Sequence, residues 1–452
     1  MRFIFNRMLP LFPSLSDYRD IKKGLRHIGI GLVVAMLLAT IQDACAESIG
    51  IPRFLTIEQA CDIALKDNPD VSIARLAVYS TRAAIDIAGA PPNPSLTVGI
   101  SGVNPNAGVG AGNLRSKTVD SSVRIDQLFE RGGKRSLRVQ NAAALNDAAE
   151  HDMQETRRQL VVAVRQAFYD LLAAQYRVAI STENATFADT TLSAARKRER
   201  AGDMAPSDVS RLQVDGLRSQ NDLTQTRGEL ARARSVLLQL LGHGAQSGEI
   251  IAKDEWPRAD RTLGIDTEAL LAQRADVRAA AARLEAARAA SRLAIAARTR
   301  DINLGIQYDH YPSSVANTQG GGNTFAFAIQ IPLFVRNQFD GEIHSAMLAA
   351  DSAEQTLLKI RDAARNEVMR LLADQQSAAE RLIRFDDQLL PAAKKSADAT
   401  EFAFLHGAIA IMDVLDVRRT YRLTQLDALA ARVEHAKVIA SLVPAPAFSG
   451  TQ

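Results

Sequence analysis

The chain has 452 residues and a formal net charge of +3, with basic and acidic residues interspersed along it. No basic patch of the kind that binds nucleic acid stands out, so we expect no nucleic-acid partner. Aromatic residues make up only 5% of the chain, which is low for a protein that must fill compact cores.

The N-terminus has the pattern of an export signal. Basic residues precede an apolar run over 28–41, which is shorter than the ~20 apolar residues of a membrane-spanning helix. Ala44-Cys-Ala46 supplies the small residues of a cleavage site. We therefore predict a signal peptide over residues 1–46, with lipidation of Cys45 as the alternative to plain cleavage. Cleavage leaves Cys61 without a partner, so neither a disulfide nor a zinc site is expected.

Two short helices are predicted next. Thr56-Ile-Glu-Gln59 is a capping-box pattern that opens a helix ending near Lys66. Asn68-Pro69 ends this helix, and Pro69 starts a second one towards Ala88. No later segment reaches the ~18 continuous apolar residues of a transmembrane helix, so any later membrane crossing must use β-structure.

The period of the apolar residues then changes from that of a helix to that of a strand. Apolar and polar residues alternate over Ser95–Ser101, and apolar and charged residues alternate over 119–126. Such strands suit either a hairpin resting on a soluble core or a membrane barrel with a water-filled lumen.

A long helical hairpin follows over 133–241. Apolar residues recur at helical spacing on both sides of a single turn around Gly202 and Pro206. At about 1.5 Å per residue, the arm over 133–201 would be on the order of 100 Å long. A helix of that length serves to span a distance.

The second half of the chain repeats the first. When Asp70-Val71 is placed on Asp276-Val277, the strand pattern around Leu96 falls on the one around Ile302. A second hairpin then runs from about Asp340 to Leu442, with a kink expected at Pro391. The predicted first repeat covers 47–241, with a strand pair near 95–129. A connector at 242–266 with one short strand leads to the second repeat at 267–443, with a strand pair near 302–334. Residues 444–452 form a tail.

Four strands cannot close a barrel, and an open sheet edge is not tolerated in lipid. If the strands enter a membrane, several chains must therefore pool them. The alanine-rich seams of the hairpins also favour side-by-side packing.

The chain resembles the TolC-like outer-membrane efflux family over essentially all of its mature sequence. The segment Leu55–Leu65 followed by Asn68-Pro69 is similar to the usual start of the family, and the duplicated strand-plus-hairpin plan is similar to its internal repeat. The two hairpin turns, Gly202–Val209 and Gly407–Asp416, carry the most specific resemblance.

The resemblance implies a mainly α-helical fold with membrane β-structure. Long α-helical hairpins would form an α-barrel, and four strands per chain would contribute to the 12-stranded β-barrel of a homotrimer. It also implies a passive outer-membrane duct, in contact with lipid, that completes a tripartite pump with a periplasmic adaptor and an inner-membrane RND-type transporter. No cofactor and no enzymatic activity are expected, and no catalytic constellation is found in the sequence.

Two segments, Gln127–Arg135 and Ile331–Asn337, resemble the CzcC-like heavy-metal branch more than the multidrug branch. The histidines are scattered and the methionines form no stripe, but a duct should not bind its cargo tightly. Heavy-metal cations are therefore the favoured cargo. The alternatives are a multidrug, organic-compound or type I secretion channel and, from another class, a soluble periplasmic coiled-coil scaffold.

The resemblance places the functional residues at the hairpin turns. Asp413 and Asp416 match positions that ring the periplasmic entrance, where threefold symmetry would make rings of carboxylates that attract cations. Phe404 and Ile409 stand where a salt-bridged gate would carry Tyr and Arg, so an apolar constriction is expected. Asp208 belongs either to the gate or to the first turn of its helix as a dipole-matched carboxylate. The expected adaptor contacts are Gly202, Ala205, Pro206, Ser207, Gly407, Ala408 and Ala410.

The predicted strands divide into two faces. Barrel-facing polar side chains should line water, and apolar side chains such as Val123, Leu304, Phe325 and Phe327 should face lipid. The expected pore-lining residues are Asp120, Arg124, Asp126, Asn303 and Gln307. No metal-binding residues are predicted.

Overall fold

The computed structural model describes residues 51–102, 119–244, 249–259, 267–312, 321–406 and 408–442. Residues 54–452 form one compact unit, which contains every helix and strand of the described chain. The expected signal peptide, Cys45 and the tail at 444–452 lie outside the described residues.

Two short helices open this unit: α2 (Ile57–Asp67) and α3 (Pro69–Gly89). The predicted capping box is present, because Thr56 and Gln59 exchange side-chain to backbone hydrogen bonds. Asn68 accepts a hydrogen bond from the first turn of α3 and donates one to the carbonyl of Leu240, 2.8 Å away. The Asn68 side chain therefore also links the start of α3 to the C-terminal end of the second helix of the first hairpin.

The first hairpin consists of α4 (Lys134–Ala201) and α5 (Pro206–Leu240). α4 has 68 residues, which at about 1.5 Å per residue gives a length on the order of 100 Å. Alanine is the commonest of its buried residues, and Phe168 is fully enclosed. Small side chains allow neighbouring helices to approach closely along this length.

The second half contributes α6 (Thr267–Gln273), α7 (Ala275–Ala296), α8 (Asp340–Arg384), α9 (Leu390–Leu405) and α10 (Ile411–Leu442). A π-helical turn, Phe385–Leu389, lies between α8 and α9, directly before Pro391. Proline lacks the N–H of the next α-helical bond, and the wider turn accommodates its ring. The structure therefore has a π-helical turn that ends two residues before Pro391, next to the position where the kink is predicted.

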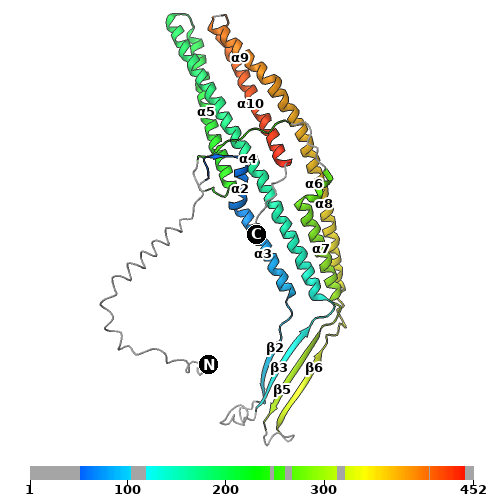
Figure 1. Ribbon diagram of the computed structural model, residues 1–452. Helices are drawn as coiled ribbons and strands as arrows, with labels where there is room; N and C mark the ends of the chain where they lie inside the picture. Colours follow the sequence, from blue (N-terminus) through cyan, green and yellow to red (C-terminus); the bar gives the residue numbers. More distant parts are fainter. Residues whose placement is uncertain are drawn as a thin grey trace, which may run out of the picture. The chain divides into compact units, whose positions relative to one another are not determined.

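The helices of the two halves pack on one another. α4 contacts α5, α3, α7 and α10, and α8 contacts α7 and α10. In Figure 1, α4 runs from the strands to the neighbourhood of the hairpin turns. In the described part of the chain, no helix combines the length and apolar character needed to cross a membrane.

The four long strands form one antiparallel sheet in the order β2 (Ser95–Ser101), β3 (Asp120–Phe129), β5 (Ile302–Tyr311) and β6 (Gly322–Gln330). β3 pairs with β5, so the central pair joins the two halves of the chain. β2 and β6 are left as the two edges. The strands lie beyond the ends of α3, α4, α7 and α8 that are opposite to the hairpin turns (Figure 1).

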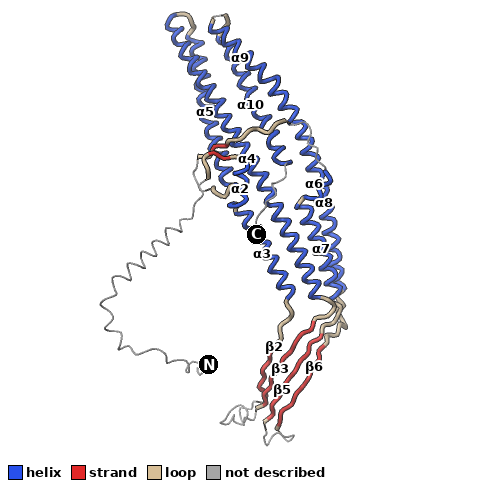
Figure 2. The backbone as a smooth tube through the Cα atoms, in the orientation of Figure 1, coloured by secondary structure: helices blue, strands red, loops and turns tan. Residues whose placement is uncertain are grey.

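A connector follows α5 and crosses the helices as a tan loop in Figure 2. Its strand β4 (Ile251–Ala252) pairs in parallel with β1 (Phe54–Leu55). The side chain of Gln175 on α4 exchanges two hydrogen bonds with the backbone of Ala252, at 2.8 and 2.9 Å. Trp256 stacks on Tyr169 of α4, with ring centroids 5.8 Å apart. These contacts fix the connector to the middle of α4.

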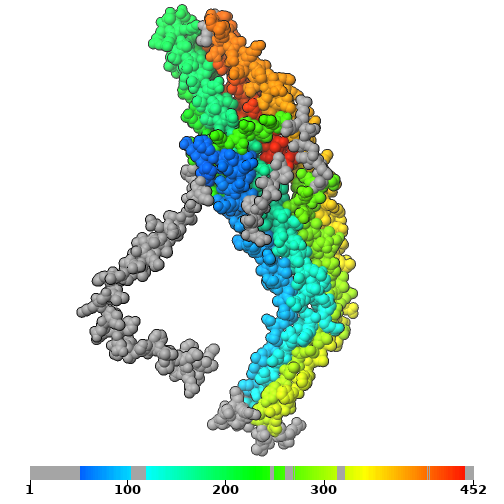
Figure 3. Space-filling view, viewed as in Figure 1, coloured from blue at the N-terminus to red at the C-terminus, as the bar shows by residue number. Residues whose placement is uncertain are grey.

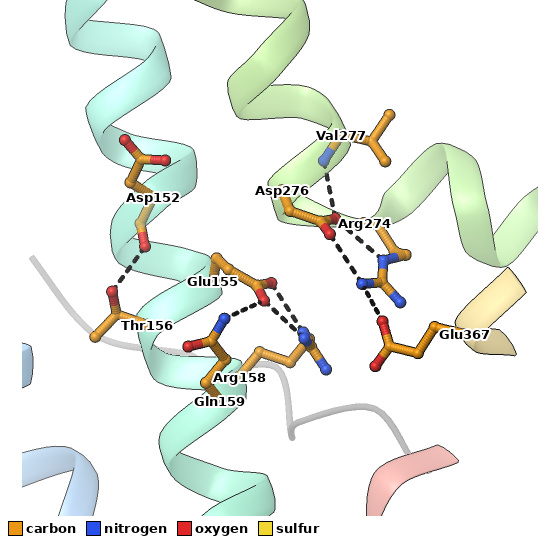
Figure 4. Close-up of polar contacts among 9 residues, drawn as sticks. All are labelled: Asp152, Glu155, Thr156, Arg158, Gln159, Arg274, Asp276, Val277 and Glu367. Atoms are coloured by element: carbon orange, nitrogen blue, oxygen red, sulfur yellow. Dashed lines mark hydrogen bonds and ion pairs between the residues drawn. The ribbon is translucent and has the colours of Figure 1, made fainter. Parts of the chain in front are cut away.

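A polar network joins α7 and α8, and a separate ion pair on α4 lies beside it (Figure 4). Arg274 contacts Asp276 and Glu367, each at 2.8 Å, and its side chain is only 10% exposed. On α4, Glu155 and Arg158 form a neighbouring pair at 2.6 Å. Burial alone would raise the pKa of Asp276, but hydrogen bonds from Arg274 and from a backbone N–H bring that pKa below its ordinary value. The network is therefore held in its charged form at neutral pH.

Candidate functional site

The first hairpin turn is built by glycine and proline. Gly202 ends α4 in the left-handed conformation with φ of +86°, which glycine adopts without strain. Its neighbour Asp203 donates a backbone hydrogen bond to the carbonyl of Arg198. Ala205 is the N-cap residue of α5, and Pro206 occupies the first turn. Gly202, Ala205, Pro206 and Ser207 are all exposed in one chain.

The second turn lies between α9 and α10. The backbone N–H of Ala408 donates to the carbonyl of Ala403, and that of Asp413 donates to Ala410. Ala408 and Ala410 are exposed. Gly407, an expected adaptor contact, lies outside the described residues. In Figure 1 the two turns lie at the same end of the unit.

An apolar cluster joins the two hairpins just behind their turns. Its buried members come from α4, α5 and α10, and Phe404 and Ile409 pack against it as half-buried side chains. The two residues therefore contact their own chain's first hairpin. The buried members are Ala195, Val209, Leu212, Ile411 and Val414.

Arginines add polar contacts between the same hairpins. Arg198 of α4 lies over the ring of Phe404, 5.2 Å from its centre, and Arg418 of α10 lies over Phe187 of α4 at 4.4 Å. Arg418 also pairs with Glu401 of α9. One turn further along α10, Arg422 pairs with Asp222 of α5 at 2.7 Å. We call Arg418, Arg422, Phe187 and Asp222 the hairpin latch.

Of the three carboxylates expected near the entrance, two are exposed and Asp208 is half-buried. Asp413 and Asp416 are exposed on α10: Asp413 lies between the buried cluster members Ile411 and Val414, and Asp416 lies two residues after Val414. Asp208 lies in the first turn of α5, where its carboxylate is 4.0 Å from Arg211. It is not the N-cap residue, which is Ala205.

The register of the sheet separates a polar face from an apolar face. Thr97, Arg124, Gln307 and Ala326 lie opposite one another across the four strands, and Arg124 forms a double hydrogen bond with Asp126 at 2.7 and 2.8 Å. Asp120 and Asn303 belong to the same face by register. The five expected pore-lining residues therefore share one side of the sheet.

The other face is apolar and exposed in a single chain. Val98, Val123, Tyr308 and Phe325 lie opposite one another on it. Its exposed fractions reach 69% at Phe325 and 79% at Phe327. Such a surface needs a covering that is itself apolar.

The hairpin latch was not anticipated from the sequence. Arg418 and Arg422 are four residues apart on one helix, which marks a shared face. Their partners Phe187 and Asp222 lie in the other half of the chain, and no local pattern identifies them. Among the described residues, no three His, Cys, Asp or Glu side chains converge in a way that would hold a metal ion.

Known proteins are similar to this chain in both sequence and fold. A family model described as "Outer membrane efflux protein" matches residues 60–243 and 267–443. The cobalt-zinc-cadmium resistance protein CzcC of Cupriavidus metallidurans is 28% identical over 415 residues, covering 86% of this chain and 92% of that protein. The pyoverdine export outer membrane protein OpmQ of Pseudomonas putida is 26% identical over 416 residues, and the cation efflux system protein CusC of Escherichia coli K12 is 27% identical over 386 residues. These alignments cover 87% of this chain and 86% of OpmQ, and 82% of both this chain and CusC.

Solved structures of outer-membrane channels have the same fold as this chain. A crystal structure of CusC matches with a TM-score of 0.71 at 22% identity, over 85% of this chain and 90% of that one. The outer-membrane channel OprN matches with the same score and identity, over 85% of this chain and 88% of its own. Because the matching family is one of outer-membrane proteins, the alternative of a soluble periplasmic scaffold is wrong. The chain belongs to the outer membrane efflux protein family: it is an outer-membrane channel with the TolC-like fold expected from its sequence, a passive duct and not an enzyme.

Proposed function

We propose that three copies of this chain form the outer-membrane duct of a tripartite efflux pump, and that the cargo is a heavy-metal cation. The observation that carries the proposal is the sheet of one chain. It has an exposed apolar face and a polar face. The outer sides of its edge strands, β2 and β6, pair with no described strand. Unpaired edges are not stable in lipid, and three such sheets supply the twelve strands of a closed barrel.

In this barrel the polar face lines water. Asp120, Arg124, Asp126, Asn303 and Gln307 line the pore, and the face of Val123 and Phe327 meets lipid. The helices extend the duct through the periplasm. There the turns around Gly202 and Ala408 receive an adaptor, which links the duct to an inner-membrane transporter.

The gate lies at the hairpin turns. Threefold repetition of Asp413 and Asp416 makes two rings of negative charge at the entrance, which favour cations and oppose tight closure. Phe404 and Ile409 supply an apolar constriction behind these rings. The hairpin latch holds each second hairpin against the first, so its release would widen the entrance.

The cargo is inferred from relatives. CzcC is named for cobalt, zinc and cadmium resistance and CusC for cation efflux, and CzcC aligns over 92% of its length. The similarity to OpmQ, over a comparable extent, favours a second candidate, export of an organic compound such as a siderophore.

Deletion of the gene tests the proposal. Loss of the duct should raise sensitivity to zinc, cobalt, cadmium, copper or silver and leave sensitivity to dyes and antibiotics unchanged, and a plasmid copy should restore resistance. The opposite pattern would assign the duct to organic compounds.

A further inference from the structure

A surplus of positive charge lies where the sheet joins the helices. The three carboxylates in the joints at 130–133, 297–301 and 331–340 are all paired: Glu130 with Arg138, Asp301 with Lys134, and Asp340 with Arg298. Four exposed arginines and one exposed carboxylate, Glu342 in the first turn of α8, lie in or next to these joints without an ion pair to a described residue. We call Arg131, Arg135, Arg300 and Arg336 the arginine belt.

Two belt residues are tied to the apolar face of the sheet by position. Phe129 and Ile302 are the last partners on the β3–β5 ladder and belong to the apolar face. Arg131 and Arg300 each lie two residues from this pair, in the joints beyond the ends of β3 and β5. The backbone N–H of Arg131 donates to the carboxylate of Asp301, 2.9 Å away, so the two joints meet at the helix end of the sheet. Both arginines therefore lie close to the last apolar pair of the ladder.

Apolar side chains accompany the belt into the joint after β6. Leu333 is 70% exposed and Val335 is 80% exposed, directly before Arg336. Phe334, between them, lies under the guanidinium of Arg300, 5.8 Å from the ring centre. This combination of exposed apolar groups and guanidiniums without ion-pair partners is typical of the boundary between hydrocarbon and headgroups in a membrane.

We propose that the arginine belt binds the anionic headgroups of phospholipids in the periplasmic leaflet of the outer membrane. The helices extend into the periplasm, so the joints lie at that leaflet. A guanidinium binds phosphate oxygens with two parallel hydrogen bonds, and Leu333 and Val335 contact the acyl chains. Peptidoglycan also carries anionic groups, but it offers no partner for these apolar side chains.

Lipid binding to the purified full-length protein tests the belt. Delipidated protein in neutral detergent is titrated with phosphatidylglycerol or phosphatidylcholine, and bound lipid is counted by native mass spectrometry while the melting temperature is recorded. Phosphatidylglycerol should bind more tightly and raise the melting temperature more. The variant R131Q/R135Q/R300Q/R336Q should lose this preference, with affinity for phosphatidylglycerol reduced on the order of tenfold or more.

Two matched variants control for folding and for total charge. The corresponding four-lysine variant keeps the charge and should retain most of the preference. R218Q/R227Q/R232Q/R361Q removes four exposed, unpaired arginines from α5 and α8 and should bind phosphatidylglycerol as the native protein does. An unchanged preference in the belt glutamine variant, or equal losses in the belt and control variants, would overturn the proposal.

Two further probes separate the lipid from other anions. Glycerol phosphate, which has no acyl chains, should protect far less than phosphatidylglycerol, and equal protection would mean that the site binds free phosphate. Sedimentation with purified peptidoglycan should not depend on the belt, and a belt-dependent loss there, with lipid binding intact, would assign the surface to the cell wall. None of these readouts involves cargo, so the result is independent of the proposed metal export.

Discussion

At the scale of single residues, charge and apolar character are separated within one turn of helix. Asp413 and Asp416 are exposed on α10, whereas Ile411 and Val414 are 7% and 1% exposed in the apolar cluster. The cluster fixes the orientation of the helix, and the two carboxylates are thereby directed away from it. In the proposed trimer, three copies of this arrangement would concentrate negative charge at one end of the duct.

Removal of these carboxylates should change the ion selectivity of the channel. Asp413→Ala with Asp416→Ala removes six negative charges from a trimer, and the preference for cations in planar bilayers should fall because the entrance loses its negative potential. Asp398→Ala with Asp427→Ala, two exposed aspartates elsewhere on the same hairpin, is the control and should leave selectivity unchanged. Equal behaviour of the two double variants would mean that the carboxylates act only as helix-end charges.

Substitution of two adjacent arginines on α10, one in the hairpin latch and one outside it, tests the role of the latch in gating. Arg418→Ala removes the contact with Phe187 and the pair with Glu401, a loss of about 1–2 kcal/mol per chain. The open fraction of single channels should rise as the hairpins separate. Arg419→Ala changes an exposed arginine with no ion pair among the described residues and should leave gating unchanged. A closed channel with Arg418→Ala would show that the apolar cluster alone holds the hairpins.

At the scale of elements, helices far apart in the sequence are joined by polar groups as well as by alanine seams. Arg274 precedes α7, Asp276 lies in its first turn, and Glu367 lies on α8. The pKa of Asp276 is below its ordinary value in the folded chain. Folding therefore favours the ionised form, and the contribution of this carboxylate to stability is present above its unfolded pKa of about 3.9 and is lost as pH falls through the lower folded value.

Asp276→Asn should therefore lower stability at neutral pH and remove part of the acid sensitivity. Arg274 would lose one of its two charged partners and keep Glu367, at an expected cost of about 1–3 kcal/mol. Melting temperatures measured from pH 7 down to pH 2.5 should converge for the native and variant proteins at the acid end. A constant difference across this range would contradict the assignment.

The elements with strong local patterns are the ones that the sequence predicts well. Ser95–Ser101 is preceded by prolines and alternates strictly, and the predicted strand coincides with β2. Gly202 and Pro206 fix the first hairpin turn to within a residue. Both rest on backbone constraints that act over a few residues.

The features that escape prediction depend on distant partners. β1 and β4 are two residues long and carry no detectable period, so their pairing follows only from the folded chain. Gln175 holds the connector through a backbone contact across 77 positions. The latch partners of Arg418 and Arg422 likewise have no local signal. The expected gate and adaptor residues come from resemblance, and their roles remain predictions.

At the scale of the whole molecule, one chain leaves surfaces uncovered that a complete channel would cover. The helices and the sheet are continuous in the space-filling view (Figure 3), but the sheet leaves an apolar face and two edges uncovered. In the proposed trimer, neighbouring chains would cover the edges, and the membrane would cover the apolar face. Shape and oligomeric state thus follow from the same surfaces.

Adjacent residues on β6 test the two faces. Phe327→Arg places a charge on the lipid side and should destabilise the barrel by about 2–4 kcal/mol near the middle of the membrane, which lowers the yield of folded trimer in the outer-membrane fraction. Ala326→Arg lies on the polar face opposite Gln307 and should permit assembly while it lowers cation conductance. The reverse pattern would exchange the faces.

The mass of the intact particle tests the central claim most directly. Native mass spectrometry of the protein extracted from the outer membrane in mild detergent should give three times the mass of the mature chain, and the same sample should form ion-conducting pores in planar bilayers. A stable monomer that folds in water, without pore activity or affinity for lipid, would contradict the account.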